Sequence, residues 1–422
     1  MRKLLDLYFL PTVIINLGNV FAFLFQFVLA HALTVDEVGA FNALFSLVNI
    51  FTAPGAIMAF ALAQMVARVS AKAPGELRVV VERSTMIGLA VAVAVVLIGS
   101  AAARLLGSLV RVENAATVVL ALVLLAGTLL HLVAVGWLQG VMRHITAAAM
   151  LAGVPTLRFV FGATLLMVIG GGVDAALIAA AAPGIVLFAA GIIAMRNACT
   201  APRAAPSPAV WHGLLRFVAV GGPAMVLLFA FWNIDVVLAR VLLSSEDSGL
   251  YAIAAVLGRI PFLSATAVAN VVFPETVRAD LSGGNAGRLA MRPLAFGLAV
   301  AAALGLTPAV ALSLLAEPVL TIFAGPAYAP ASALLGVIAF AMATLALVQI
   351  VVTFMLARNQ FMVLLPVAIA LGTFVALSLT FATGPLWIAC CLGTIIVVLL
   401  AVCLGLFLLA APSRAWKKVR FV

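Results

Sequence analysis

Apolar stretches long enough to cross a lipid bilayer recur along this chain, and they limit its fold more than any other feature. A helix needs about 20 apolar residues to span the ~30 Å hydrocarbon core, and the 422 residues supply that length twelve times. Only 9% of the residues are charged, whereas soluble domains have about 25%. The two-residue alternation of a membrane β-barrel is missing, so we expect an all-α polytopic membrane protein. The expected spans are 8–32, 40–66, 84–105, 115–139, 145–169, 174–195, 214–242, 250–274, 293–314, 331–356, 360–382 and 386–410.

Charged residues outside the spans fix the expected orientation of the chain. Cytoplasmic connections of membrane proteins are enriched in Lys and Arg, and here these residues fall on alternate connections, with Arg104 and Arg111 as the exceptions. We therefore expect a multi-pass protein of the bacterial inner membrane with both termini in the cytoplasm. The net charge of +10 reflects this topology and not a nucleic-acid partner. The opposite connections carry acidic residues, namely Asp36, Glu37, Asp174, Glu246, Asp247 and Glu317.

No cofactor or metal is predicted. His131 lies inside the fourth span without a second His one turn away, so we expect it to be a packing residue. A Walker-type phosphate-binding sequence is also missing, which argues against direct use of ATP. Coupling to H⁺ or Na⁺ stays open. The four cysteines lie in or beside apolar spans without metal-ligand spacing and are Cys199, Cys390, Cys391 and Cys403.

The chain repeats itself after about half its length. A shift of 210 residues, without gaps, superposes an acidic pair, a glycine, an aromatic residue and an arginine. Each half has an even number of spans, so a pseudo-twofold axis along the membrane normal should relate the halves. We predict a six-helix bundle over 1–196, a Pro- and Ala-rich cytoplasmic linker over 197–213, and a second six-helix bundle with a basic cytoplasmic tail over 214–422. The superposed residues are Asp36-Glu37 with Glu246-Asp247, Gly39 with Gly249, Phe41 with Tyr251 and Arg68 with Arg278.

Few charges are expected near the middle of the membrane, where each costs roughly 2.5–3.5 kcal/mol on insertion scales. In the first half of the chain Arg158 is the only such charge. It either caps backbone carbonyls or faces a cavity, where its planar fork would suit phosphate oxygens. Asp235 and Arg259 should lie at the same depth on neighbouring spans, so we expect an ion pair between them.

Polar residues at helical spacing indicate polar faces on several spans. In the seventh span Asn233 and Arg240 share a face, whereas Asp235 points the other way. A polar face either lines a solvated cavity or joins helices by hydrogen bonds, and both interpretations stay open. The other faces comprise Asn16, Asn19 and Gln26 in the first span, Asn42, Ser46 and Asn49 in the second, and Arg259, Thr266 and Asn270 in the eighth.

The connections carry more local predictions. We place residues 35–39 and 244–249 in acidic turns that precede the second and eighth spans. Residues 68–83, which contain Ala73-Pro-Gly75, are expected to form a cytoplasmic loop. Pro261 should kink the eighth span.

The seventh and eighth spans also resemble a known family. Asp235 is followed by an acidic turn with Gly249-Leu-Tyr251, by Leu257-Gly-Arg-Ile260 and by Phe273-Pro274. This pattern is similar to the polysaccharide-transporter branch of the multidrug/oligosaccharidyl-lipid/polysaccharide (MOP) exporter superfamily, which includes the O-antigen flippases. The resemblance implies a MATE-like pair of bundles around a central cavity, with basic residues for a pyrophosphate head group. By this resemblance the candidate cavity residues are Arg158, Arg259, Arg240, Asp235, Asn233, Asn270 and Asn49.

The expected function is therefore that of a flippase. It would move a polyprenyl-(pyro)phosphate-linked oligosaccharide from the cytoplasmic to the outer leaflet by alternating access, as a monomer that makes and breaks no bonds. A multidrug or organic-cation exporter of the same superfamily is the main alternative, but it would favour acidic residues well inside the first six spans, where none is found. A glycan polymerase or ligase would need a sizeable outer loop, and the outer connections are short. The chain also lacks the two extra helices of lipid II flippases.

Overall fold

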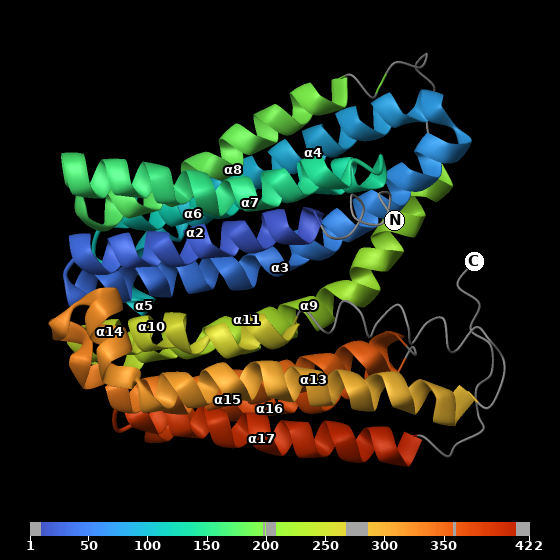
Figure 1. Ribbon diagram of the computed structural model, residues 1–422. Coiled ribbons are helices and arrows are strands. Elements are labelled where there is room, and N and C mark those ends of the chain that lie inside the picture. Colours follow the sequence, from blue (N-terminus) through green and yellow to red (C-terminus); the bar gives the residue numbers. More distant parts are fainter. Residues whose placement is uncertain (1–9, 197–198, 200–207, 267–285, 358–359, 411–422) are drawn as a thin grey trace. The chain divides into compact units, whose positions relative to one another are not determined.

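A computed structural model of the protein describes residues 10–196, 199, 208–266, 286–357 and 360–410 (Figure 1). The described part is helical and contains no strand. Twelve helices are long and apolar enough to cross a membrane, which confirms the predicted class and number of spans. The spanning stretches run over Leu10–Ala32, Val35–Lys72, Pro74–Ala101, Ala115–Gly140, His144–Ile169, Gly172–Arg196, Gly221–Leu242, Ser245–Ala265, Ala295–Leu314, Pro326–Leu356, Phe361–Phe381 and Pro385–Leu408.

The chain forms two compact units, Met1–Gly249 and Leu250–Val422. Unit 1 contains α2 (Leu10–Ala32), α3 (Val35–Lys72), α4 (Pro74–Ala101), α5 (Ala103–Leu109), α6 (Ala115–Gly140), α7 (His144–Gly162), the π-helical η2 (Ala163–Ile169), α8 (Gly172–Arg196) and α9 (Pro208–Leu242). Helix α10 (Ser245–Gly258) begins in unit 1 and continues into unit 2. Unit 2 further contains α11 (Ile260–Thr266), α13 (Ala286–Leu314), α14 (Ala316–Ala324), η3 (Pro326–Ala331), α15 (Ser332–Ala357), η4 (Phe361–Val363), α16 (Leu364–Phe381) and α17 (Pro385–Ala410).

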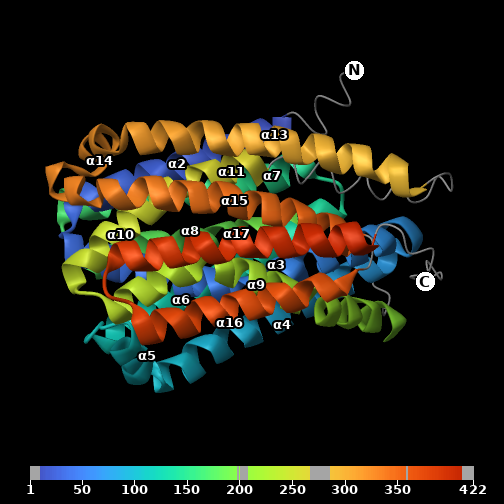
Figure 2. The same cartoon turned by 90° about the horizontal axis from the view of Figure 1, so that it is seen from below.

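The boundary between these units follows Gly249 and not the predicted linker at 197–213, because α9 packs along α3. Most of that linker lies outside the described residues, so the predicted grouping of six and six spans stays a prediction. Within unit 1, α3 packs against α6 and α9, α6 against α4 and α8, and α2 against α7 (Figures 1 and 2). Within unit 2, α15 packs between α13 and α17, and α11 contacts α13 and α15.

Small residues allow the helices of unit 1 to approach closely. A Cβ atom at Gly136 of α6 would lie 2.7 Å from the Ala59 carbonyl oxygen of α3, and one at Gly184 of α8 would lie 2.8 Å from the Gly127 backbone of α6. Glycine is therefore required where α6 meets both neighbours, as is common between membrane helices. This packing fixes α6 in the middle of the unit.

Three predicted connections are helical. The segment 68–83 is divided between the end of α3 and the start of α4, with Pro74 in the first turn of α4, where its missing N–H costs no hydrogen bond. Residues 35–39 and 245–249 form the first turns of α3 and α10. Helices α10 and α11 are separated by Arg259 alone, two residues before Pro261, and its N–H donates to the Ala255 carbonyl (3.1 Å) as in a continuous helix. The kink at Pro261 stays a prediction.

The helix starts at 35 and 245 have the same hydrogen-bonded cap, which the turn prediction overlooked. The Glu37 N–H donates to the Thr34 hydroxyl (3.3 Å), and the Thr34 N–H donates to the Glu37 carboxylate (2.9 Å). At the position shifted by 210 residues, the Asp247 N–H donates to the Ser244 hydroxyl (3.1 Å), which donates to the Asp247 carboxylate (2.8 Å). Each arrangement uses a hydroxyl and an acid three residues later, the pattern of a capping box. The repeat is thus visible in local geometry.

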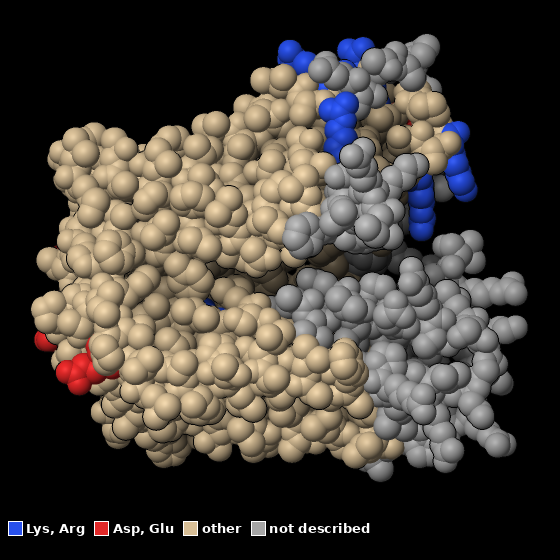
Figure 3. All heavy atoms as spheres, in the orientation of Figure 1, with Lys and Arg blue, Asp and Glu red and all other residues tan. Residues whose placement is uncertain are grey.

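Many of the described Lys and Arg side chains of unit 1 gather at the end of α3, near the start of α4 and at the end of α8, as Figure 3 shows for one face. This arrangement agrees with the distribution of charge along the sequence. The residues concerned include Arg68, Lys72, Arg78, Arg83 and Arg196.

Candidate functional site

Arg158 lies in α7, and its guanidinium faces two aromatic rings inside unit 1. Its Cζ atom is 4.9 Å from the centroid of the Phe45 ring of α3 and 5.9 Å from that of the Phe25 ring of α2. Both distances are within the range of cation–π attraction. Among the described residues, no hydrogen bond or ion pair to this guanidinium occurs, and its buried Nε atom has no acceptor. The interpretation that Arg158 caps backbone carbonyls therefore receives no support from the described contacts.

Neighbouring residues hold these rings in place. A Cβ atom at Gly162, one turn beyond Arg158, would lie 2.5 Å from Phe25 Cε2, so only glycine leaves room for that ring against α7. Phe41 contacts the Phe25 ring edge-on at 5.8 Å and stacks on the Phe45 ring at 5.6 Å. The aromatic cluster therefore orders the surface on which the guanidinium rests.

Polar groups continue into the interior of unit 1. Gln26 Nε2 donates to Asn42 Oδ1 (3.1 Å), and Asn42 Nδ2 donates to the Val38 carbonyl (3.0 Å). These two residues of the predicted polar faces join α2 to α3, so here the faces act as hydrogen-bonded contacts. Asn16, in contrast, is exposed and donates to the Thr12 carbonyl of its own helix. His131 of α6 is 3% exposed and its two ring nitrogens have no hydrogen-bond partner among the described residues.

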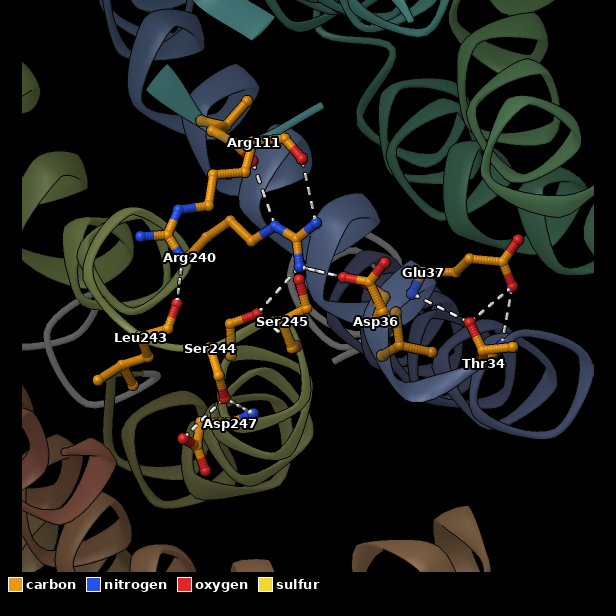
Figure 4. Close-up of polar contacts among 12 residues, drawn as sticks. Thr34, Asp36, Glu37, Arg111, Arg240, Leu243, Ser244, Ser245 and Asp247 are labelled. Carbon is orange, nitrogen blue, oxygen red and sulfur yellow. Dashed lines mark hydrogen bonds and ion pairs between the residues drawn. The ribbon is translucent and has the colours of Figure 1, made fainter. Parts of the chain in front are cut away.

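Arg240, near the end of α9, has a different environment (Figure 4). Its Nη1 donates to the Asp36 carboxylate (2.5 Å) at the start of α3 and to the Ser248 hydroxyl (3.1 Å) of α10. Its Nε and Nη2 donate to the carbonyls of Val110 (3.2 Å) and Arg111 (3.3 Å). We call Asp36, Val110, Arg111, Arg240 and Ser248 the Arg240 clamp.

The clamp also closes the end of α9. Arg111, whose φ of 52° is in the left-handed region, donates from Nη1 to the Leu243 carbonyl (2.6 Å) just beyond that helix. Cations at a helix C-terminus satisfy free carbonyls and oppose the negative end of the helix dipole. Because all three guanidinium nitrogens of Arg240 bind protein groups, these contacts support a structural role for it, and its place at a cavity stays a prediction.

The remaining candidates are distributed over both units. Asn49 Nδ2 donates to Asn233 Oδ1 (3.4 Å), so the structure brings these two candidate residues together between α3 and α9. Asp235 is completely buried in α9. It belongs to unit 1 and Arg259 to unit 2, so their ion pair stays a prediction. Asn270 lies outside the described residues.

Sequence analysis did not identify the aromatic surface or the partners of Arg240. A ring contact between Arg158 and Phe45 leaves no spacing signal, because the two residues are on helices far apart in sequence. Asp36 could have been recognised as part of a helix start, since Thr34 and Glu37 have capping-box spacing. For Arg240 the sequence offered one signal: the residue lies in the last turn of its helix, where a cation can bind free backbone carbonyls.

Comparisons with known proteins agree with this fold. Residues 8–279 match the family described as polysaccharide biosynthesis protein. No curated protein is significantly similar to the chain. Among solved structures, the lipid II flippase MurJ in an inward closed conformation is 12% identical with a TM-score of 0.75, covering 94% of this chain and 87% of its own.

Two further structures are similar over nearly the whole chain. An inward-facing MATE family multidrug resistance transporter of the MOP superfamily is 15% identical with a TM-score of 0.74, covering 95% of this chain and 96% of its own. A MOP superfamily transporter from Pyrococcus furiosus, for which a reverse polarity of the binding pocket suggests a different function, is 16% identical with a TM-score of 0.60, covering 96% and 95%. The family match spans more than half of the sequence, and the fold is that of the MOP transporters. The chain therefore belongs to the polysaccharide biosynthesis protein family, as a multi-pass membrane protein with the MOP-superfamily fold.

Proposed function

We propose that this protein is a flippase that moves a polyprenyl-(pyro)phosphate-linked oligosaccharide from the cytoplasmic to the outer leaflet for cell-surface polysaccharide synthesis. The single observation that carries this proposal is the environment of Arg158, a cation inside unit 1 that two aromatic rings hold and that no described residue pairs. Family membership supports the polysaccharide part of the proposal, and the similarity to the lipid II flippase MurJ supports a lipid-linked substrate.

The chemistry of Arg158 fits a phosphate. A guanidinium is always charged and presents two parallel N–H groups to two oxygens of one phosphate. The rings of Phe25 and Phe45 attract its positive charge, and no described residue accepts a hydrogen bond from its buried Nε, which leaves this donor for a ligand. In this proposal Arg158 binds the phosphate group next to the lipid, and no bond of the substrate is made or broken.

An organic-cation exporter is the weaker candidate. It would bind its substrate through interior carboxylates, but the described acidic side chains of the first six spans lie near helix starts. Asp36 binds Arg240, Glu37 caps α3, Asp174 accepts a hydrogen bond from Thr117, and Glu82 pairs with Arg78. The reverse pocket polarity of the Pyrococcus furiosus neighbour shows that the charge of a binding pocket varies within this fold.

Variants of Arg158 test the proposal. We expect Arg158→Ala and Arg158→Gln to lower export of the oligosaccharide to the cell surface about tenfold or more, because a charged hydrogen bond contributes about 1.5–3 kcal/mol. Arg158→Lys should restore part of it. Membrane abundance is measured in parallel. Full export by the Ala variant at normal abundance would remove Arg158 from the site, and a loss of export in proportion to abundance would make it structural.

In this proposal the protein lies in a bacterial inner membrane, with both termini and the 197–213 linker on the cytoplasmic side. Reporter fusions after Arg203 test it, since an active periplasmic reporter there would contradict the topology. Thiol labelling of Cys199 is a slower probe of the same connection. Burial raises the pKa of this thiol, so the reactive thiolate is scarce at neutral pH.

A further inference from the structure

His131 is a second interior polar group that the proposed function does not use. Its side chain is 3% exposed, and neither ring nitrogen has a hydrogen-bond partner among the described residues. A neutral imidazole has one N–H donor and one acceptor nitrogen, and a buried polar group without partners costs free energy. This position is therefore unusual for a residue that only fills space.

The packing of α6 shows where the ring points. Gly127 faces α8, because a Cβ atom there would lie 3.2 Å from the Ala181 carbonyl oxygen. Leu130 and Val133 face Gly88 of α4. His131 follows Gly127 by four residues, which is a rotation of about 40° around the helix axis. His131 is therefore rotated from the side that faces α8, in the direction away from α4. The ring thus points into the interior of unit 1.

His131 and Arg158 lie at different backbone depths, but their side chains lean toward each other. Helices α6 and α7 run in opposite directions from their connection at 141–143. His131 is nine residues before Gly140, or ~14 Å, and Arg158 is fourteen residues after His144, or ~21 Å, at 1.5 Å per residue. Side chains lean toward the N-terminus of their own helix, so the long Arg158 side chain points back to the depth of the imidazole.

The other charged residues on the helices around α6 lie away from His131. The elements packed against α6 are α3, α4, α5, α7 and α8. Of their described charged or titratable groups, Arg158 alone lies near the middle of a spanning helix. The other such groups of these elements lie nearer to the helix ends and are Asp36, Glu37, Arg68, Lys72, Glu76, Arg78, Glu82, Arg83, Arg104, His144, Asp174 and Arg196.

We propose that Arg158 and His131 form one oxyanion site, for a phosphate or pyrophosphate group, in which the imidazole takes up a proton from water as the anion binds. The lipid-linked source of that anion rests on the proposed function, but the site itself does not. No bond of the anion changes, and the proton returns to water when the anion leaves.

The physical reason is linkage between the two charges. A second positive charge beside an unpaired guanidinium would be repelled strongly, because the interior has a low dielectric constant. An anion on Arg158 removes that repulsion and offers the imidazolium an acceptor. Anion binding and proton uptake must then favour each other by the same factor. The occupied site has two positive charges, which suits a pyrophosphate better than a monovalent ion.

Calorimetry on the purified full-length protein in detergent tests this site with inorganic pyrophosphate as the probe. Titrations at about pH 5.5 and about pH 7.5 lie on either side of the usual histidine pKa of ~6.5. We expect affinity to be at least about fivefold higher at the lower pH, with a fraction of a proton taken up for each anion bound. Pyrophosphate titrates in this range too, so the readout is the difference between wild type and variant.

His131→Asn keeps a polar side chain but cannot gain the charge. Its affinity should match that of the wild type at the higher pH, and between the two pH values it should change only as much as the titration of pyrophosphate itself requires. His131→Gln serves if the Asn variant does not fold. His31→Asn is the matched control, because His31 is an exposed histidine of the same unit. A pH response as large in both His131 variants as in the wild type would overturn the proposal, as would wild-type protein that binds no pyrophosphate or binds chloride equally well.

A transport arm separates this inference from the proposed function. Flipping is measured in vesicles that contain a polyprenyl-pyrophosphate oligosaccharide. If flipping depends on Arg158 but responds to pH identically in wild type and His131→Asn, the proton-linked site is wrong and the flippase proposal stands. If no flipping occurs but free pyrophosphate binds with proton uptake, the flippase proposal is wrong and the proton-linked site stands.

Discussion

Arg158 and Arg240 are both arginines inside unit 1, but their surroundings differ completely. Arg240 donates from all three guanidinium nitrogens to groups of α3, α10 and the connection after α5. Arg158 contacts only the faces of two phenylalanine rings among the described residues. A buried charge with a full set of partners stabilises one arrangement of helices. A buried charge without partners is a cost to the fold, so we infer that it serves a ligand.

The largest expected effect comes from a glycine next to the clamp. A Cβ atom at Gly249 would overlap the carbonyl oxygen of Val35, which is backbone and cannot move aside. Gly249→Ala should therefore destabilise the protein by about 3 kcal/mol or more, measured as a lower thermal unfolding midpoint in detergent. Gly372→Ala is the control, because a Cβ atom there meets nothing within 4 Å. Equal stability of the two variants would mean that α3 and α10 do not need this contact.

A direct comparison of the two arginines follows. Arg240→Gln should lower the free energy of unfolding by about 2–3 kcal/mol, because it leaves the Val110 and Arg111 carbonyls and Asp36 without their partner. Arg158→Gln should change it by less than about 1 kcal/mol, because the cation–π contacts that are lost and the cost of the buried charge that is removed offset each other. Thermal unfolding and membrane abundance of both variants measure the contrast. If Arg158→Gln proves the less stable of the two, the division into a structural and a ligand-binding arginine is wrong.

Hydropathy and loop charge were sufficient to predict the spans, because the bilayer requires about 20 apolar residues of each helix. The partners of the two arginines were not predictable in the same way. Asp36 and Arg240 lie on different helices, and their ion pair depends on how α3 and α9 pack. Only the helix starts carried a local signal, since Thr34–Glu37 and Ser244–Asp247 have the hydroxyl-to-acid spacing of a cap. Asn49 and Asn233, by contrast, were each predicted to lie on a polar face, and the structure joins them by a hydrogen bond.

A smaller effect is expected at the acidic side of the clamp. Asp36→Asn keeps an acceptor for Arg240 but removes the charge, and the Asp36 side chain is 53% exposed in the ion pair. Solvent screening limits such a pair to about 1 kcal/mol or less. Unfolding measured at low and high salt should show a modest loss for this variant and a weaker salt dependence than in the wild type. A loss as large as that of Arg240→Gln would show that the ion pair, and not the carbonyl contacts, holds the clamp.

The smallest effect concerns the surface on which Arg158 rests. Phe45→Leu removes the ring 4.9 Å from the guanidinium but keeps an apolar side chain of similar reach. A cation–π contact contributes about 0.5–2 kcal/mol, so oligosaccharide export should fall about threefold to tenfold at normal abundance, because Arg158 loses its orientation and not its charge. Phe21→Leu is the matched control, since the Phe21 ring lies 5.7 Å from the Phe159 ring and the cation–π contacts of Arg158 are with Phe25 and Phe45. If both variants lose export equally, the aromatic surface stabilises α2, α3 and α7 in general. If only Phe45→Leu does, the ring positions the guanidinium, and the difference between Arg158 and Arg240 extends from their hydrogen bonds to the residues that support them.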